Sequence, residues 1–130
     1  MPSDALDLPD GLTGPDLLRA VGAHRLAAAG EPLHLVGHGS SGIAVLSLAL
    51  HQRRLGLDLA GVTCLGAAGQ ADPLTGVTLA RPDPPRRPTS VLFVAGADPA
   101  SVDWTAATAA AWAAAGWDVI RSEGTRPPNA

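Results

Sequence analysis

The sequence has no lysine, a single cysteine and few aromatic residues, namely three Trp and one Phe. All nine basic residues are therefore Arg; they are scattered along the sequence, and the formal net charge is −3. This distribution predicts no basic patch, so nucleic acid and anionic membrane surfaces are not expected as partners. Because Cys64 is alone, a disulfide framework or a cysteine-based metal site is excluded within one chain.

Long apolar runs are also missing, since none approaches the ~20 residues that a membrane-spanning helix needs. The first seven residues, Met1 to Asp7, are acidic and lack the basic and apolar regions of a signal peptide. We therefore expect a soluble, cytoplasmic protein without a membrane partner.

What the sequence does contain is enough apolar material for one folded domain. Of its 130 residues, 46% are hydrophobic and only 16% are charged, which favours a buried core over disorder. Cys64 lies inside the apolar run from Leu59 to Leu65, where a buried, unreactive thiol is expected. Trp104 and Trp112 are interpreted as packing anchors rather than as ligand platforms.

Hydrophobic periodicity and stop signals divide the chain into alternating elements. Three helices are expected at about 15–29, 40–54 and 103–115, with Thr13 and Ser101 as candidate N-caps of the first and third. Strands are expected at 33–36, 59–65, 91–95 and 117–121. This order predicts an α/β fold, a three-layer sandwich with a short, mostly parallel sheet of about four strands.

The domain is expected to span residues 14–121. Residues 1–13 are polar and turn-rich and are predicted to be a flexible lead-in, and residues 122–130 a polar tail. Residues 66–89 form a long connector rich in Gly and Pro. Because ordinary connections are shorter, it is interpreted as a functional loop or as the remnant of a removed element.

The most informative segment is the turn between the first expected strand and the second expected helix, Gly37-His38-Gly39-Ser40-Ser41-Gly42. A nucleophile at the apex of such a strand-to-helix turn needs small residues two positions before and after it. An apex at 40 has the bulky His38 before it, and an apex at 41 has Ile43 after it. An apex at 39 satisfies both conditions, but Gly39 carries no side chain.

Three stretches together resemble the C-terminal half of the α/β-hydrolase superfamily of esterases, lipases and thioesterases. Residues 31–38 resemble the strand that leads to the nucleophile, residues 59–69 the next strand, and residues 88–98 the strand that delivers the catalytic acid. The resemblance implies that Gly39 is a vacant nucleophile position and that Asp98 is the acid. It also requires a base histidine after the last strand, but no histidine follows His51.

Each candidate residue also has an ordinary structural interpretation. Ser40 and Ser41 are either helix N-caps or nucleophiles in a remodelled turn. Asp98 could be a plain turn residue, and Asp103, the alternative acid, a charge at a helix start. Gly37, His38, Ser40 and Gly42 are the candidate ligand-binding residues, because the Ser40 N–H would point into a pocket suited to a carbonyl or an anion.

Three functions remain open. The first is a catalytically impaired α/β-hydrolase-like domain that binds a small acyl or ester ligand, or pairs with a partner chain or a second copy through an exposed sheet edge. The second is an ester or thioester hydrolase that uses Ser40 or Ser41 with Asp98 and a base from elsewhere. The third is a metal-handling protein, because Val36–Ser40 is similar to the strand-end motif of the sirohydrochlorin chelatases. A lone His38 is a weak metal ligand, so no metal or other cofactor is expected.

Overall fold

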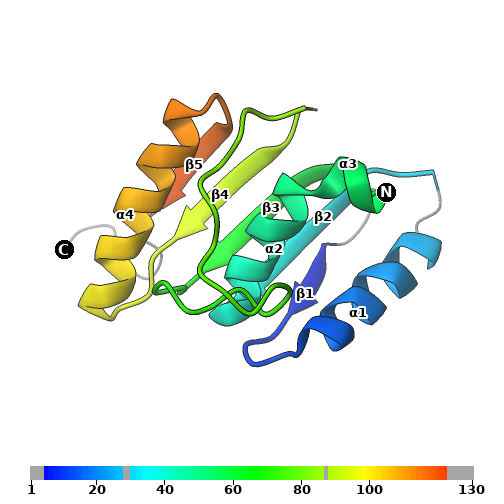
Figure 1. The fold of residues 1–130 in the computed structure, drawn as a ribbon, viewed down its shortest axis with the longest axis horizontal. Helices are drawn as coiled ribbons and strands as arrows, with labels where there is room; N and C mark the ends of the chain where they lie inside the picture. Colours follow the sequence, from blue (N-terminus) through cyan, green and yellow to red (C-terminus); the bar gives the residue numbers. More distant parts are fainter. Residues whose placement is uncertain (1–4, 28–29, 87, 123–130) are drawn as a thin grey trace.

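The computed structural model describes residues 5–27, 30–86 and 88–122, which form a five-stranded sheet covered by helices (Figure 1). All strand pairs are parallel, and the strands lie in sequence order across the sheet. The strands are β1 (Leu6–Leu8), β2 (Leu33–His38), β3 (Leu59–Leu65), β4 (Ser90–Val94) and β5 (Asp118–Ser122). The predicted α/β class and parallel sheet are confirmed, with five strands instead of four.

The additional strand, β1, lies in the segment that was expected to be a flexible lead-in. Leu6 and Leu8 pair with Leu35 and Gly37 of β2, and Leu8 is buried. A three-residue strand that contains Asp7 carries too short an alternation to be recognised from its sequence. Of the expected C-terminal tail, Ser122 ends β5, and residues 123–130 lie outside the described residues.

Among the described residues, four helices connect the strands: α1 (Gly14–Ala27), α2 (Ser40–Leu50), α3 (Gln52–Leu55) and α4 (Pro99–Ala114). Thr13 caps α1 as predicted, because its hydroxyl accepts the Asp16 N–H at 3.2 Å. The helix expected over 40–54 is interrupted at His51. The predicted cap Ser101 is wrong, since Asp98 caps α4 and the helix begins earlier.

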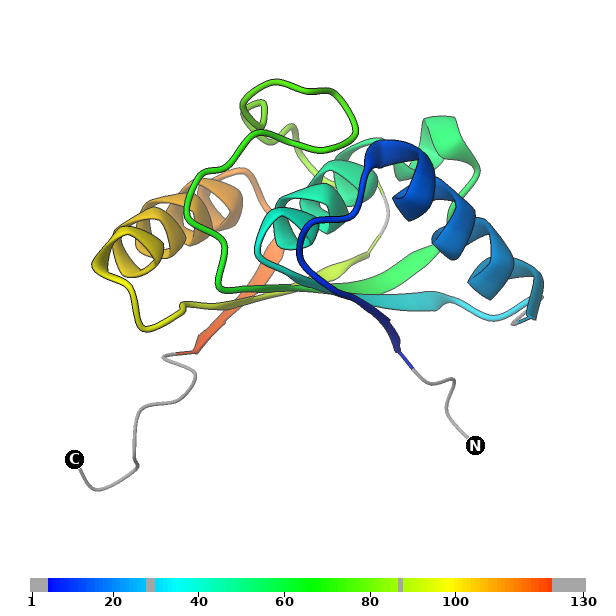
Figure 2. The same ribbon diagram turned by 90° about the horizontal axis from the view of Figure 1, so that it is seen from below.

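The helices all lie on one face of the sheet, so the described residues form two layers and not the expected three (Figure 2). Each right-handed crossover moves one strand further in the same direction, and this places every helix on the same side. On the other face, no helix of the described residues covers a shallow hollow. Its lining includes Val36, Thr63, Leu92 and Ile120.

The core lies between the sheet and α2. This helix is apolar nearly all round, and its residues from Ser41 to Ala49 are all buried. At the other end of the sheet, Trp112 packs against Phe93 and Trp117, with ring centroids 6.3 and 4.7 Å apart, which confirms its role as an anchor. Cys64 is buried as predicted, and desolvation raises the pKa of its thiol to about 12.

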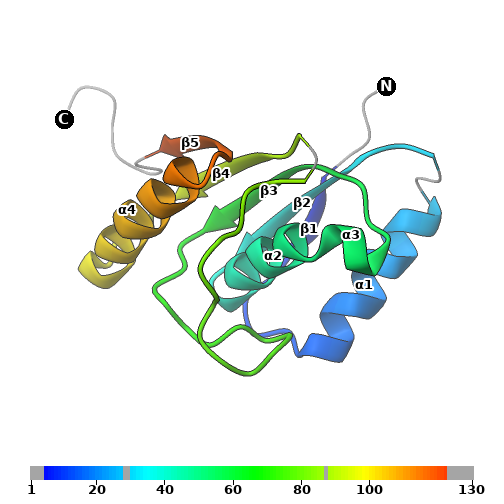
Figure 3. The same cartoon turned by 45° about the horizontal axis from the view of Figure 1, so that its top comes forward.

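The long connector between β3 and β4 crosses the helical face of the domain beside α2 (Figure 3). It contains a compact turn in which the buried Asp72 carboxylate accepts the Leu74 N–H at 2.9 Å. Further along, the backbone carbonyl of Asp83 accepts a hydrogen bond from the Trp117 indole at 2.8 Å. Leu74 and Leu79 of the connector also pack against the core, so the connector contacts the domain at more than one point. None of the described helices combines the length and the apolar character that a membrane-spanning helix requires.

Candidate functional site

The candidate site lies where the carboxyl ends of β1 and β2 meet, at the edge of a parallel sheet where ligands and catalytic groups usually gather. The turn after β2 is tied to the next strand, because the Gly39 N–H donates to the Leu65 carbonyl at 2.8 Å. The segment 9–11, which follows β1, lies against the same turn and makes hydrogen bonds to Ser40 and Ser41.

Backbone geometry explains why this turn needs small residues. Gly39 has φ 58° and ψ −122°, in the region that favours glycine. A side chain at Gly37 would overlap the Ser41 carbonyl, and one at Gly42 would come within 2.9 Å of the Cys64 sulfur. The sharp turn with its apex at 39 is therefore confirmed.

The space above Gly39 is occupied by the carboxylate of Asp10. A Cβ atom at position 39 would lie 2.5 Å from the Asp10 Cγ and Oδ1 atoms. Oδ1 accepts hydrogen bonds from the Ser40 N–H at 2.8 Å and from the Ser40 hydroxyl at 2.9 Å. These bonds lower the pKa of Asp10, with a smaller contribution from the Gly11 N–H and from the charge of His38.

Asp10 was missed at the sequence level because residues 1–13 were interpreted as a lead-in. Its signal was the pair Asp10-Gly11, which is typical of a turn after a strand. The Asp10 carboxylate accepts the hydrogen bond of the Ser40 N–H, which was expected to point into a ligand pocket. A carbonyl or anion could bind at this N–H only by displacing Asp10.

Both serine hydroxyls are held by the segment 9–11 and do not cap α2. The Ser40 Oγ accepts the Gly11 N–H at 3.2 Å, in addition to donating to Asp10. Ser41 is fully buried and donates to the Pro9 carbonyl at 2.6 Å. The N-cap is Gly39, which has no side chain to cap with, so the expectation of a serine cap is wrong.

A histidine–carboxylate pair lies beside the turn. The His38 Nε2 atom is 2.7 Å from the Asp7 Oδ1 atom, and both side chains are partly exposed. Strand alternation places His38 and Asp7 on the sheet face that carries no helix. Asp7 was not among the predicted residues, because only the pairing of β1 with β2 brings it to His38.

The predicted acid is not joined to the turn. Asp98 accepts the Ala100 N–H at 3.3 Å as the N-cap of α4. No hydrogen bond or ion pair among the described residues links it to residues 37–42, and Asp103 lies exposed within α4. In the described part of the chain, no group of three His, Cys, Asp or Glu side chains could hold a metal ion.

Comparison with solved structures identifies proteins that share this fold. A mutant of the esterase E40 aligns with a TM-score of 0.58 and 17% identity. An esterase from the bacterial hormone-sensitive lipase family aligns with the same score and 19% identity. The alignments cover 85% and 88% of this chain but only 50% of each esterase, so the chain spans about half their length. No protein-family model and no curated protein matches the chain.

Proposed function

We propose that the chain is an esterase-like α/β-hydrolase domain without catalysis of its own, which acts by pairing with a second polypeptide. The observation that carries the first part is the Asp10 carboxylate, which fills the space where a side chain at the apex of the turn would stand. The hydroxyl of the next residue, Ser40, donates a hydrogen bond to this carboxylate. A serine without a histidine base is a poor nucleophile at neutral pH.

An ester hydrolysis assay tests the missing catalysis. We expect the purified chain to hydrolyse p-nitrophenyl acetate no faster than buffer, and the Ser40→Ala and Ser41→Ala variants to behave in the same way. Turnover above buffer that disappears in only one of the two variants would overturn the proposal and identify the nucleophile.

A second candidate function, a weak ester hydrolase, is favoured by the His38–Asp7 pair. A carboxylate that holds an imidazole at 2.7 Å is the arrangement by which a general base is oriented. Ser40 is two residues further along the chain and would be its nucleophile if Asp10 moved away. Removal of Asp10 tests this alternative: Asp10→Ala would then gain ester turnover that depends on both His38 and Ser40.

Pairing with a second copy is supported by the outer strands of the sheet. The edge of β2 is not exposed, because β1 pairs with it. β5 has only β4 as its neighbour among the described residues, and most of its residues are exposed. An exposed edge of this kind can pair with another strand.

Light scattering at micromolar concentration should give twice the monomer mass, and a monomer would contradict the pairing.

A further inference from the structure

Two cavities lie at the end of α2 that is remote from the turn at Gly39. Each has a volume of about 500 Å³, within the usual range of small-molecule sites. They share two lining residues, His51 and Arg54, and so adjoin each other around the junction of α2 and α3. Ser47, the residue of α2 nearest the turn that lines either cavity, is seven residues after Ser40, which is about 10 Å along the helix.

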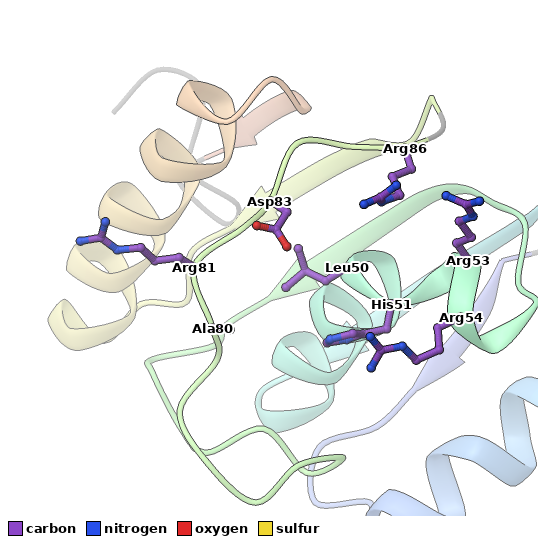
Figure 4. Close-up of a pocket in the computed structure, with 8 residues that line it drawn as sticks. All are labelled: Leu50, His51, Arg53, Arg54, Ala80, Arg81, Asp83 and Arg86. Atoms are coloured by element: carbon purple, nitrogen blue, oxygen red, sulfur yellow. The ribbon is translucent and has the colours of Figure 1, made fainter.

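The first cavity is basic (Figure 4). It lies between the end of α2, α3 and the connector, and its ionisable lining residues are His51, Arg53, Arg54, Arg81, Asp83 and Arg86. Arg53 and Arg86 come from opposite walls, whereas Arg81 points away from the other arginines (Figure 4). The fold thus gathers arginines that are scattered along the sequence.

Within the described residues, no ion pair joins these arginines to a carboxylate. Among the described residues the ion pairs are Arg19–Asp16 and His38–Asp7, and neither belongs to this cavity. Asp83 is the only acidic residue in the lining and lies within 4 Å of none of the guanidinium groups. In a chain of net charge −3, this is a local excess of unpaired positive charge that an anion would neutralise.

The second cavity is largely apolar. It lies between the start of α1, the end of α2 and the connector. Leu18 and Leu55 line it and remain 50% and 41% exposed, although both are large apolar side chains. Pro15, Pro73 and Leu74 complete this apolar lining. An apolar group that covers this surface would remove it from contact with water, which is favourable.

Two residues line both cavities and lie where the cavities meet. The Nδ1 atom of His51 lies 2.9 Å from the Ser47 carbonyl, which can only accept, so Nδ1 donates and the ring is fixed. His51 thus places a fixed ring at the boundary of the two cavities. Arg54, three residues further on, supplies a guanidinium group that lines both cavities.

We propose that the two cavities form one binding site for an amphiphilic anion, a carboxylate or phosphate monoester with a single alkyl chain. The head group lies against Arg53, Arg54 and Arg86. The chain passes His51 and covers Leu18 and Leu55. This site is independent of the turn at Gly39 and of whether the chain hydrolyses esters.

Isothermal titration calorimetry with monomeric probes tests the proposal. Decyl phosphate and decanoate should bind, whereas inorganic phosphate and decanol should each bind at least about tenfold more weakly, because each lacks one half of the recognised chemistry. If decyl phosphate and decanol bind equally well, the arginines do not hold the head group. If decyl phosphate and inorganic phosphate bind equally well, the apolar cavity does not hold the alkyl chain. Binding to phosphatidylglycerol vesicles without binding to monomeric decyl phosphate would overturn the cavity in favour of a bilayer surface.

Matched variants locate the site. Arg54→Gln and the Arg53→Gln/Arg86→Gln double variant should each weaken decyl phosphate binding about tenfold, because a charge-assisted hydrogen bond is lost. Arg121→Gln, on β5, should leave binding unchanged. Leu18→Ser should weaken the binding of decyl phosphate but not that of inorganic phosphate. Leu26→Ser, at an 81% exposed position on the same helix, should change neither. Circular dichroism shows whether each variant is folded, and unchanged binding in folded Arg54→Gln overturns the proposal.

Discussion

At the scale of single residues, the turn after β2 is controlled by the pairing of a glycine with a carboxylate. Gly39 provides the positive φ that the turn requires, and its missing side chain leaves the space that Asp10 fills. The sequence predicts the first of these features, because the small residues around Gly39 are adjacent in the chain. It does not predict the second, because Asp10 reaches the turn only through β1.

Substitution of Gly39 by Ser should destabilise the protein. The serine would adopt φ near 58° and would place its Cβ atom 2.5 Å from the Asp10 carboxylate. We expect a loss of about 1–3 kcal/mol in the free energy of unfolding, measured by urea denaturation. The control is Gly22→Ser in α1, where a Cβ atom meets nothing within 4 Å, and the change should be below about 1 kcal/mol. Equal stability of both variants would contradict the tight packing at Gly39.

The Asp10 carboxylate should make stability depend on pH. Its hydrogen bonds with Ser40 lower its pKa from the ordinary value of 3.8, so the folded state holds this group ionised more strongly than the unfolded state does. Its stabilising effect is therefore complete above pH 3.8 and is lost as the pH falls below the lowered pKa. Wild type should be more stable than Asp10→Asn at pH 6, and the difference should shrink at pH 3. A difference that is constant with pH would contradict this account, and Asp103→Asn is the exposed control.

At the scale of elements, local patterns predicted the interior of each helix and strand better than its ends. β3 has the predicted bounds, because its continuous apolar run is flanked by clear turn residues. The start of α4 was misplaced because Asp98 was interpreted as a turn residue, although the Pro99 that follows it is favoured in the first turn of a helix. The boundary depended on which polar side chain caps the helix, and both Asp98 and Ser101 are suitable cap residues.

The two residues at the start of α4 should differ in their effect on stability. Asp98 makes one exposed capping hydrogen bond, so Asp98→Ala should cost about 1 kcal/mol. Ser101 is buried; its hydroxyl accepts the Gly96 N–H at 2.9 Å and donates to the Ala67 carbonyl at 2.8 Å. Ser101→Ala leaves both backbone groups unsatisfied and should cost more, up to about 3 kcal/mol in urea denaturation. A larger loss for Asp98→Ala would indicate a contact beyond the cap.

At the scale of the whole molecule, the sheet topology explains what the sequence could not show. The parallel order β1 to β5 places all helices on one face, and parallel sheets usually have both faces covered. The solved esterases that share the fold are about twice as long as the matched region. Strand order depends on contacts between distant segments, such as Asp7 with His38, and no local pattern encodes these contacts.

The outer edge of β5 provides the last prediction. In a twofold pairing of two antiparallel copies of β5, the middle residue of the strand, Ile120, lies opposite its own copy. Ile120 is 56% exposed, and Ile120→Lys would place two positive charges face to face. Light scattering should therefore give a dimer for wild type and a monomer for Ile120→Lys. Leu26→Lys, on α1, should stay dimeric because α1 is remote from that edge. A dimer that persists in Ile120→Lys would assign the pairing to another surface, such as β1 or the face without helices.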